Sequence, residues 1–246
     1  MEEKKVLDYI ENVLENMPLD WLKLTTHRLD IYNEELAKTE FLDQFENLFS
    51  ENTSLISALS NLPTAFDYIR LGHPLSSILE WGIAKLNGIK PDNVISFSSR
   101  TIPVLAVLRT NLFDNKKTQI CYTGELPDYF DAEVIKEVYG YNFELKQVES
   151  ADTISKFEGS TIFISQDETI GEIDLPSTID FYISIYAELG SLLVVNGAKN
   201  ESYISPIQHV RRRETISMTP ADSLSALKQL VGKNSTEAPK NQLDSN

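Results

Sequence analysis

This sequence has almost no cysteine: Cys121 is the only one among its 246 residues. A disulfide within the chain is therefore excluded, and we expect this apolar-flanked thiol to be buried as a small hydrophobic side chain. Histidine is scarce as well, and His27, His73 and His209 show no metal-ligand spacing with each other or with the cysteine. The sequence therefore predicts neither a disulfide framework nor a metal site.

Long apolar runs are missing too. No run approaches the roughly 18 residues of a membrane span, and the start Met1-Glu2-Glu3-Lys4-Lys5 lacks the features of a secretory signal. Positive charge is in short supply, because 22 Lys and Arg against 37 Asp and Glu give a formal net charge of −15. Nucleic-acid binding needs Lys and Arg to neutralise many phosphates. We therefore expect a cytoplasmic protein with no membrane or nucleic-acid partner.

The first pattern that the sequence does contain is helical. Over residues 1–60, apolar residues recur at helical spacing opposite acidic ones; the clearest set is Val6, Tyr9, Ile10, Val13, Leu14 and Met17. This pattern predicts a helical N-terminal region. Its plain interpretation is a solvated acidic face over an apolar stripe, and the alternative is an arm that packs on a partner subunit.

The second pattern begins at Pro74, where apolar helical segments alternate with short β-rich runs. We expect strands near residues 94–97, 118–122, 143–148, 161–165 and 191–195, and helices over 76–86, 102–112, 132–139 and 177–189. Such alternation predicts an α/β fold, a mostly parallel sheet with helices on both faces. Residues 233–246 are too polar to repay the entropy of ordering, and we expect a disordered tail there.

The segment Tyr68-Ile69-Arg70-Leu71-Gly72-His73-Pro74 is followed by Leu79-Glu80 and by Gly88 at the end of the same predicted helix. It resembles the Tyr-x-Arg-x-Gly-Asn-Pro signature of the cystathionine synthase and lyase family. These enzymes of cysteine and methionine metabolism (transsulfuration) depend on pyridoxal phosphate (PLP). The resemblance implies a PLP-dependent-transferase-type large domain over residues 61–232.

The resemblance also assigns residues to the cofactor phosphate. Tyr68 and Arg70 would grip a phosphate in the neighbouring subunit of a dimer, the arginine through its bidentate fork; the alternative is two surface residues at a turn. Ser99 and Arg100 stand where the family binds the phosphate with backbone amides at a helix N-terminus after Ser-Gly. The Arg100 side chain either blocks close backbone approach or contributes its charge, and the alternative is a helix start capped by Ser99.

Two further positions concern the PLP ring. Asn196 stands where the family has an Asp that keeps the pyridine nitrogen protonated, which a neutral amide cannot do in the same way. Ser223 stands where the family has the lysine that links PLP, at the end of an Asp-Ile-x-x run and a short strand. Lys228 cannot be assumed to substitute, because the linking amine must lie at one fixed place. The basic run Arg211-Arg212-Arg213 is expected to be a solvated edge beside a strand, with anion binding as the alternative.

The sequence also ends shortly after the lysine position, so the resemblance implies that the small C-terminal domain is absent. We therefore expect a protein without catalytic residues of its own, which binds PLP non-covalently or has lost it. It would act as a partner or regulatory subunit, as a homodimer or in a hetero-oligomer with a catalytic relative. One alternative is a PLP-dependent lyase or transferase that acts on sulfur amino acids in a mixed oligomer. Another is a scaffold or small-molecule-binding protein, because a fold does not fix a function.

Overall fold

Runs rich in Ile, Val, Phe and Tyr, which suit a pleated and buried surface, form most strands of a single sheet. The computed structural model describes residues 2–23, 34–63, 69–166, 169–171 and 173–232. Its strands are β1 (Val94–Phe97), β2 (Thr118–Tyr122), β3 (Glu144–Gln147), β4 (Ser160–Ser165), β5 (Phe181–Tyr186) and β6 (Gly190–Val195).

The sheet has the strand order β1-β6-β5-β4-β2-β3. Strand β6 runs antiparallel to β1 and β5, whereas β5 with β4, β4 with β2 and β2 with β3 pair in parallel. All strands except β6 therefore point the same way. Their carboxyl ends meet at one edge of the sheet, called the carboxyl edge below, and the opposite edge is called the amino edge. The prediction of a mostly parallel sheet is confirmed.

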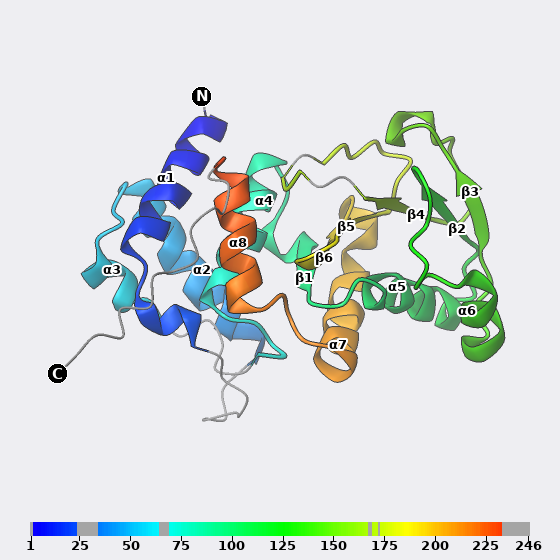
Figure 1. The fold of residues 1–246 in the computed structure, drawn as a ribbon, viewed down its shortest axis with the longest axis horizontal. Coiled ribbons are helices and arrows are strands. Elements are labelled where there is room, and N and C mark those ends of the chain that lie inside the picture. Colours follow the sequence, from blue (N-terminus) through cyan, green and yellow to red (C-terminus); the bar gives the residue numbers. More distant parts are fainter. Residues whose placement is uncertain (1, 24–33, 64–68, 167–168, 172, 233–246) are drawn as a thin grey trace.

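Helices cover both faces of this sheet (Figure 1). One layer holds α1 (Glu2–Asn16), α2 (Glu34–Ser50), α3 (Ile56–Ser60), α4 (Pro74–Leu86) and α8 (Pro220–Leu230). The other holds α5 (Ile102–Phe113), α6 (Ala132–Tyr139) and α7 (Ile204–Glu214). Each layer shares one hydrophobic cluster with the face that it covers.

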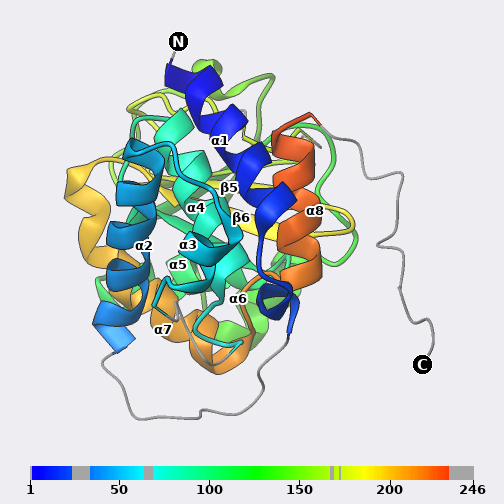
Figure 2. The ribbon, with the colours of Figure 1, turned by 90° about the vertical axis from the view of Figure 1, so that its left-hand side faces the viewer.

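The predicted helical N-terminal region is present. Figure 2 looks onto this layer and shows α2 and α8 on either side of α1 and α4. Tyr9 of α1 contacts the rings of Phe45, Phe49 and Trp81 edge to face at 5.2–6.4 Å, so the stripes of α1, α2 and α4 meet in one aromatic cluster. Within the described ranges, no helix has both the length and the apolar character needed to cross a membrane.

The helix predicted over 177–189 is wrong, because this segment contains strand β5. Its residues Phe181-Tyr182-Ile183-Ser184-Ile185-Tyr186 are mostly aromatic or β-branched and are all buried. Such side chains lose rotamer freedom in a helix and pack well between neighbouring strands. Burial on both faces removed the alternation that would have identified the strand.

The structure also corrects the expected setting of the arginine run. Arg211, Arg212 and Arg213 form the last turn of α7 instead of lying beside a strand, and Arg211 is only 5% exposed. The segment after α7 leads directly into α8. The tail predicted over 233–246 lies outside the described residues.

Candidate functional site

Open α/β sheets bind ligands beyond the carboxyl ends of their strands, which in this fold meet at the carboxyl edge. Strand β1 is followed there by Ser98–Thr101, which leads into α5, and β5 by the turn that returns as β6. The Ser191 hydroxyl at the start of β6 donates to the Ser99 carbonyl at 2.6 Å. Ser99 and Arg100, two of the residues that the sequence predicted as cofactor contacts, therefore lie at this edge.

The Ser99 side chain provides a hydrogen-bond acceptor for backbone amides at the N-terminus of α5. Its Oγ accepts from the amides of Thr101 and Ile102 at 3.3 and 3.2 Å. The next residue, Pro103, has no amide hydrogen, and the amides of Val104 and Leu105 donate to the Thr101 carbonyl at 3.1 and 3.2 Å. From Thr101 to Leu105, every backbone N–H that an anion could use at this helix end already has a partner.

Arg100 is exposed and is held by its neighbours. Its Nη1 donates to the Ala187 carbonyl at 3.1 Å, and its guanidinium lies 4.7 Å from the centre of the Tyr129 ring. These contacts join the ends of β1 and β5 to the loop after β2. Burial raises the pKa of the Tyr129 phenol, against the opposite effect of the Arg100 charge, so the ring stays neutral at physiological pH.

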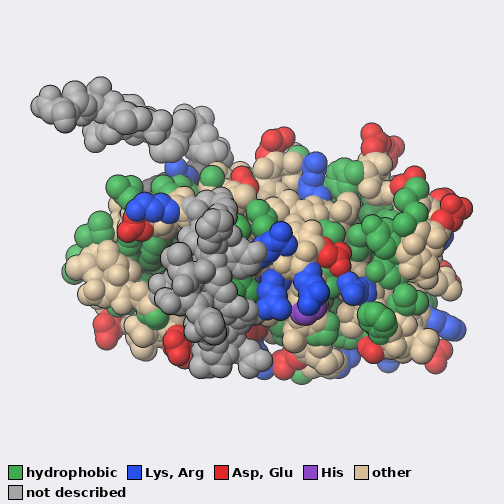
Figure 3. All heavy atoms as spheres, turned by 90° about the horizontal axis from the view of Figure 1, so that it is seen from below, with side chains coloured by type: hydrophobic (Ala, Val, Ile, Leu, Met, Phe, Trp, Pro, Cys, Tyr) green, Lys and Arg blue, Asp and Glu red, His purple; other side chains and the backbone are tan. Residues whose placement is uncertain are grey.

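Arg70 is also held within its own chain. Its Nη1 donates to the carbonyls of Arg212 and Arg213 at 3.3 and 3.2 Å, at the C-terminus of α7, where cations and donors are favourable. Figure 3 shows one face of the molecule, on which cationic side chains gather around a histidine. Arg70, and His209 and Arg213 of α7, are exposed. Tyr68, the predicted companion of Arg70, lies outside the described residues.

The two residues predicted for the PLP ring lie elsewhere. Asn196 follows β6, whose end is at the amino edge, roughly 17 Å along the strand from Gly190 by the rise of about 3.3 Å per residue. Its Nδ2 donates to the carbonyls of Pro176 and Ile179 at 3.2 and 2.7 Å. Ser223 is buried in the first turns of α8, where its hydroxyl donates to the Met218 carbonyl at 3.3 Å. Asn196 thus lies at the edge opposite to Ser99 and Arg100, and Ser223 is used inside the helical layer that contains α8.

Strand β5, which directly follows Asp180, also ends at the carboxyl edge. This end reads Tyr186-Ala187-Glu188, so it contains no lysine either. The residues present at the carboxyl edge do not fit a covalently held PLP, nor a phosphate bound by the amides of α5.

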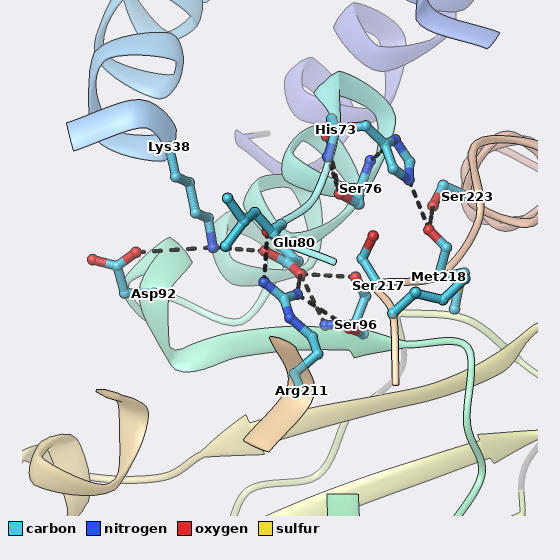
Figure 4. A network of polar contacts seen from close by, with 12 residues as sticks. Lys38, His73, Ser76, Glu80, Asp92, Ser96, Arg211, Ser217, Met218 and Ser223 are labelled. Atoms are coloured by element: carbon cyan, nitrogen blue, oxygen red, sulfur yellow. Dashed lines mark hydrogen bonds and ion pairs between the residues drawn. The ribbon is translucent and has the colours of Figure 1, made fainter. Parts of the chain in front are cut away.

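A buried ionic network lies beside β1 (Figure 4), and no pattern in the sequence indicated it. Glu80 of α4 accepts from Lys38 of α2 at 2.6 Å and from Arg211 of α7 at 3.2 Å, and all three side chains are less than 10% exposed. Burial alone would raise the pKa of Glu80, but Lys38 and Arg211 outweigh burial and hold it below its ordinary value. The exposed Asp92 adds a second carboxylate 3.8 Å from Lys38.

This network supplies hydrogen-bond partners for the side of strand β1 that faces away from β6. Glu80 accepts from both the amide and the hydroxyl of Ser96 at 2.8 Å, and Arg211 donates to the Ser96 carbonyl at 3.2 Å. The amides of Val94 and Ser98 donate to the carbonyls of Pro91 and Ile216. Side chains and loops therefore take the hydrogen bonds that another strand would make.

His73 fixes the beginning of α4 next to this network. Its Nδ1 accepts from the Ser76 amide at 3.2 Å, so Nε2 carries the proton that is donated to the Met218 carbonyl at 2.7 Å. Burial lowers the pKa of His73 to about 4, against the opposing influence of the Met218 bond and of Glu80. A neutral histidine thus holds the segment before α8 against the start of α4.

A cavity of about 360 Å³ lies at the amino edge, away from the residues above. It opens between the end of α5 and the starts of β2 and β3, and Lys116, Lys117 and Phe143 are among its lining residues. Within the described ranges, no three His, Cys, Asp or Glu side chains gather as metal ligands.

Comparisons with known proteins bear on the fold alone. No protein-family model and no curated protein matches the chain. Among solved structures, the chain is similar to metB from Corynebacterium glutamicum, with a TM-score of 0.51 and 12% identity over 92% of this chain and 64% of that chain. It is also similar to the cystathionine gamma-lyase from Lactobacillus plantarum complexed with L-serine, with a TM-score of 0.51 and 10% identity over the same shares.

These similarities confirm the predicted fold class, an α/β fold of the PLP-dependent-transferase type with a helical N-terminal region. They support the resemblance to the cystathionine synthase and lyase family at the level of the fold. The chain spans 64% of the length of either solved structure.

Proposed function

We propose that this protein is a cytoplasmic, non-catalytic member of the PLP-dependent-transferase fold group, which acts as a partner or regulatory subunit of a catalytic relative in cysteine and methionine metabolism. One observation carries the proposal. Among the described residues where β1 and β5 end, there is neither a lysine that could link PLP nor, from Thr101 to Leu105, an unbonded amide that could hold its phosphate.

The contacts of the predicted cofactor residues support the same proposal. Arg70 bonds to the end of α7, Arg100 to the β5–β6 turn, and Ser223 to the segment before its own helix. Each of these side chains stabilises a junction between elements of this chain. These polar side chains already have hydrogen-bond partners within the chain, so they need no bound cofactor as a partner.

PLP loading followed by borohydride reduction tests the absence of catalysis. After incubation with PLP, we expect no stoichiometric visible-absorbing lysine–PLP linkage and no stoichiometric PLP mass on the reduced protein. The matched control is Lys228→Ala, which removes the lysine closest in sequence to Ser223. A stoichiometric linkage that is present in the natural chain and lost in Lys228→Ala would show that a reactive lysine exists.

Activity assays test the partner role. The chain alone should not turn over cystathionine or O-acylhomoserine, and mixing it with a full-length catalytic relative should change that enzyme's activity or mass in solution. Turnover by the chain alone would contradict the non-catalytic assignment. A relative whose activity and mass both stay unchanged would contradict the partner role.

A further inference from the structure

Strand β3 leaves one side of the sheet open. It is the terminal strand, and all four of its residues are exposed. The Val148 amide donates to the Tyr122 carbonyl, and Lys146 is paired with Cys121, so the even-numbered residues direct their backbone groups to β2. The backbone groups of Leu145 and Gln147 therefore point outward, away from the sheet.

The charges on β3 form a self-complementary pattern. Glu144 and Lys146 lie on the same face of the sheet, on either side of Leu145. An antiparallel copy of the strand, related by a two-fold axis at Leu145, puts Glu144 of each copy opposite Lys146 of the other. Leu145 then meets Leu145 as a hydrogen-bonded pair, since its amide and carbonyl already face outward.

Other arrangements of the same strand bring like charges together. A parallel copy in register puts Glu144 opposite Glu144 and Lys146 opposite Lys146. An antiparallel copy shifted by two residues puts one of these two residues opposite itself. Like charges directly opposite each other destabilise a strand pair, and opposite charges stabilise it.

We propose that β3 is a dimerisation edge, at which two copies of this chain pair antiparallel about Leu145 and join their sheets. This surface is independent of the proposed function. Helix α6, which lies at the same end of the molecule (Figure 1), adds an apolar surface with exposed Val134 and Val138 one helical turn apart and Tyr139 half exposed. Such side chains belong to the buried part of an interface when a partner covers them.

Charge reversal and its rescue test the proposed register. Glu144→Lys puts two pairs of like charges across the two-fold axis and should weaken dimerisation about tenfold, and the double variant E144K/K146E should restore it to within about threefold. The measurement is sedimentation velocity over a concentration series. The control Glu51→Lys makes the same change in net charge at an exposed turn after α2 and should leave the dimer unchanged.

A disulfide provides a second readout. Opposite residues of a hydrogen-bonded antiparallel pair have Cα atoms about 5.5 Å apart, which suits a disulfide. Leu145→Cys should therefore give a covalent dimer under mild oxidation, whereas Leu55→Cys, exposed on the opposite end of the molecule, should not. Native Cys121 is buried and stays unreactive.

Three results would overturn the proposal, provided that circular dichroism shows folded variants. The first is a natural chain that stays monomeric at its highest soluble concentration. The second is a dimer that Glu144→Lys does not weaken, which would place the contact on another surface. The third is a Leu145→Cys variant that cross-links no more than Leu55→Cys.

Discussion

Glu80 is a single residue that joins four separate elements. It lies on α4, accepts from cations on α2 and α7, and accepts from the backbone of β1. Removing one member of a buried ion pair leaves the remaining charge without compensation, which is costlier than losing an exposed pair. This carboxylate should therefore be decisive for stability.

We predict that Glu80→Gln lowers the free energy of unfolding by about 3–5 kcal/mol, because Arg211 stays buried without a counter-charge and Lys38 keeps only the exposed Asp92, 3.8 Å away. The matched control is Glu46→Gln, since Glu46 is 36% exposed and also accepts from a lysine, Lys85. It should cost about 1 kcal/mol or less. Urea unfolding followed by far-UV circular dichroism measures both, and equal losses would contradict the prediction.

His73 makes stability depend on pH. Its native pKa is about 4 and its unfolded pKa is the ordinary 6.5, so on acidification the unfolded chain takes up the proton first. The contribution of His73 to the free energy of unfolding is complete above pH 6.5. It is lost as the pH falls towards 4, with a slope of up to about 1.4 kcal/mol per pH unit.

In His73→Asn, an amide can still cap α4, but the titrating group is gone. Its unfolding free energy should fall less between pH 7 and pH 5 than that of the natural chain, as measured by urea titration at each pH. Parallel pH profiles for the two proteins would show that His73 is not the group responsible.

At the scale of elements, a short turn sets the pairing of β5 with β6. Tyr186 pairs with Gly190, and Gly190 has a φ of +107°. A Cβ atom at this position would collide with the carbonyl oxygen of Phe97 on β1. Only glycine satisfies both the backbone angle and the close approach of β1.

Gly190→Ala should therefore destabilise the protein by about 3 kcal/mol or more, from the left-handed angle and from overpacking together. Gly124→Ala is the control, because Gly124 has a φ of +66° and a Cβ atom added there would lie in open space. It should cost only about 1–2 kcal/mol, the conformational part alone. Thermal unfolding of the two variants separates these contributions, and indistinguishable melting temperatures would contradict the role of the contact.

Local signals explain which elements the sequence predicted well. The strands expected at 94–97 and 118–122 and the helix at 132–139 have these bounds in the structure. Each is bounded by residues that typically start or end an element; for example, Asp131 caps the start of α6 and Gly140 ends it. Strand β5 lacks such a signal, because it is buried on both faces and shows no alternation.

At the scale of the whole molecule, the sequence predicted the layers but not the contacts between distant segments. Ser99 was placed correctly at the start of α5, since a cap is a local feature. The pairing of Glu80 with Lys38 and Arg211 joins residues 42 and 131 positions apart, and no local pattern encodes it. The roles towards a cofactor stay predictions for all six residues, which are Tyr68, Arg70, Ser99, Arg100, Asn196 and Ser223.

The completed side of β1 limits how far copies of this chain can assemble. With the outward amides of Val94, Ser96 and Ser98 and the carbonyl of Ser96 already bonded, β1 is a poor template for another strand. Pairing through β3 uses the same surface on both copies, so it closes after two. Two chains would form a finite twelve-stranded sheet with β1 of one copy at each end. Because β1 is a poor template for a further strand, this geometry does not favour growth into a fibre.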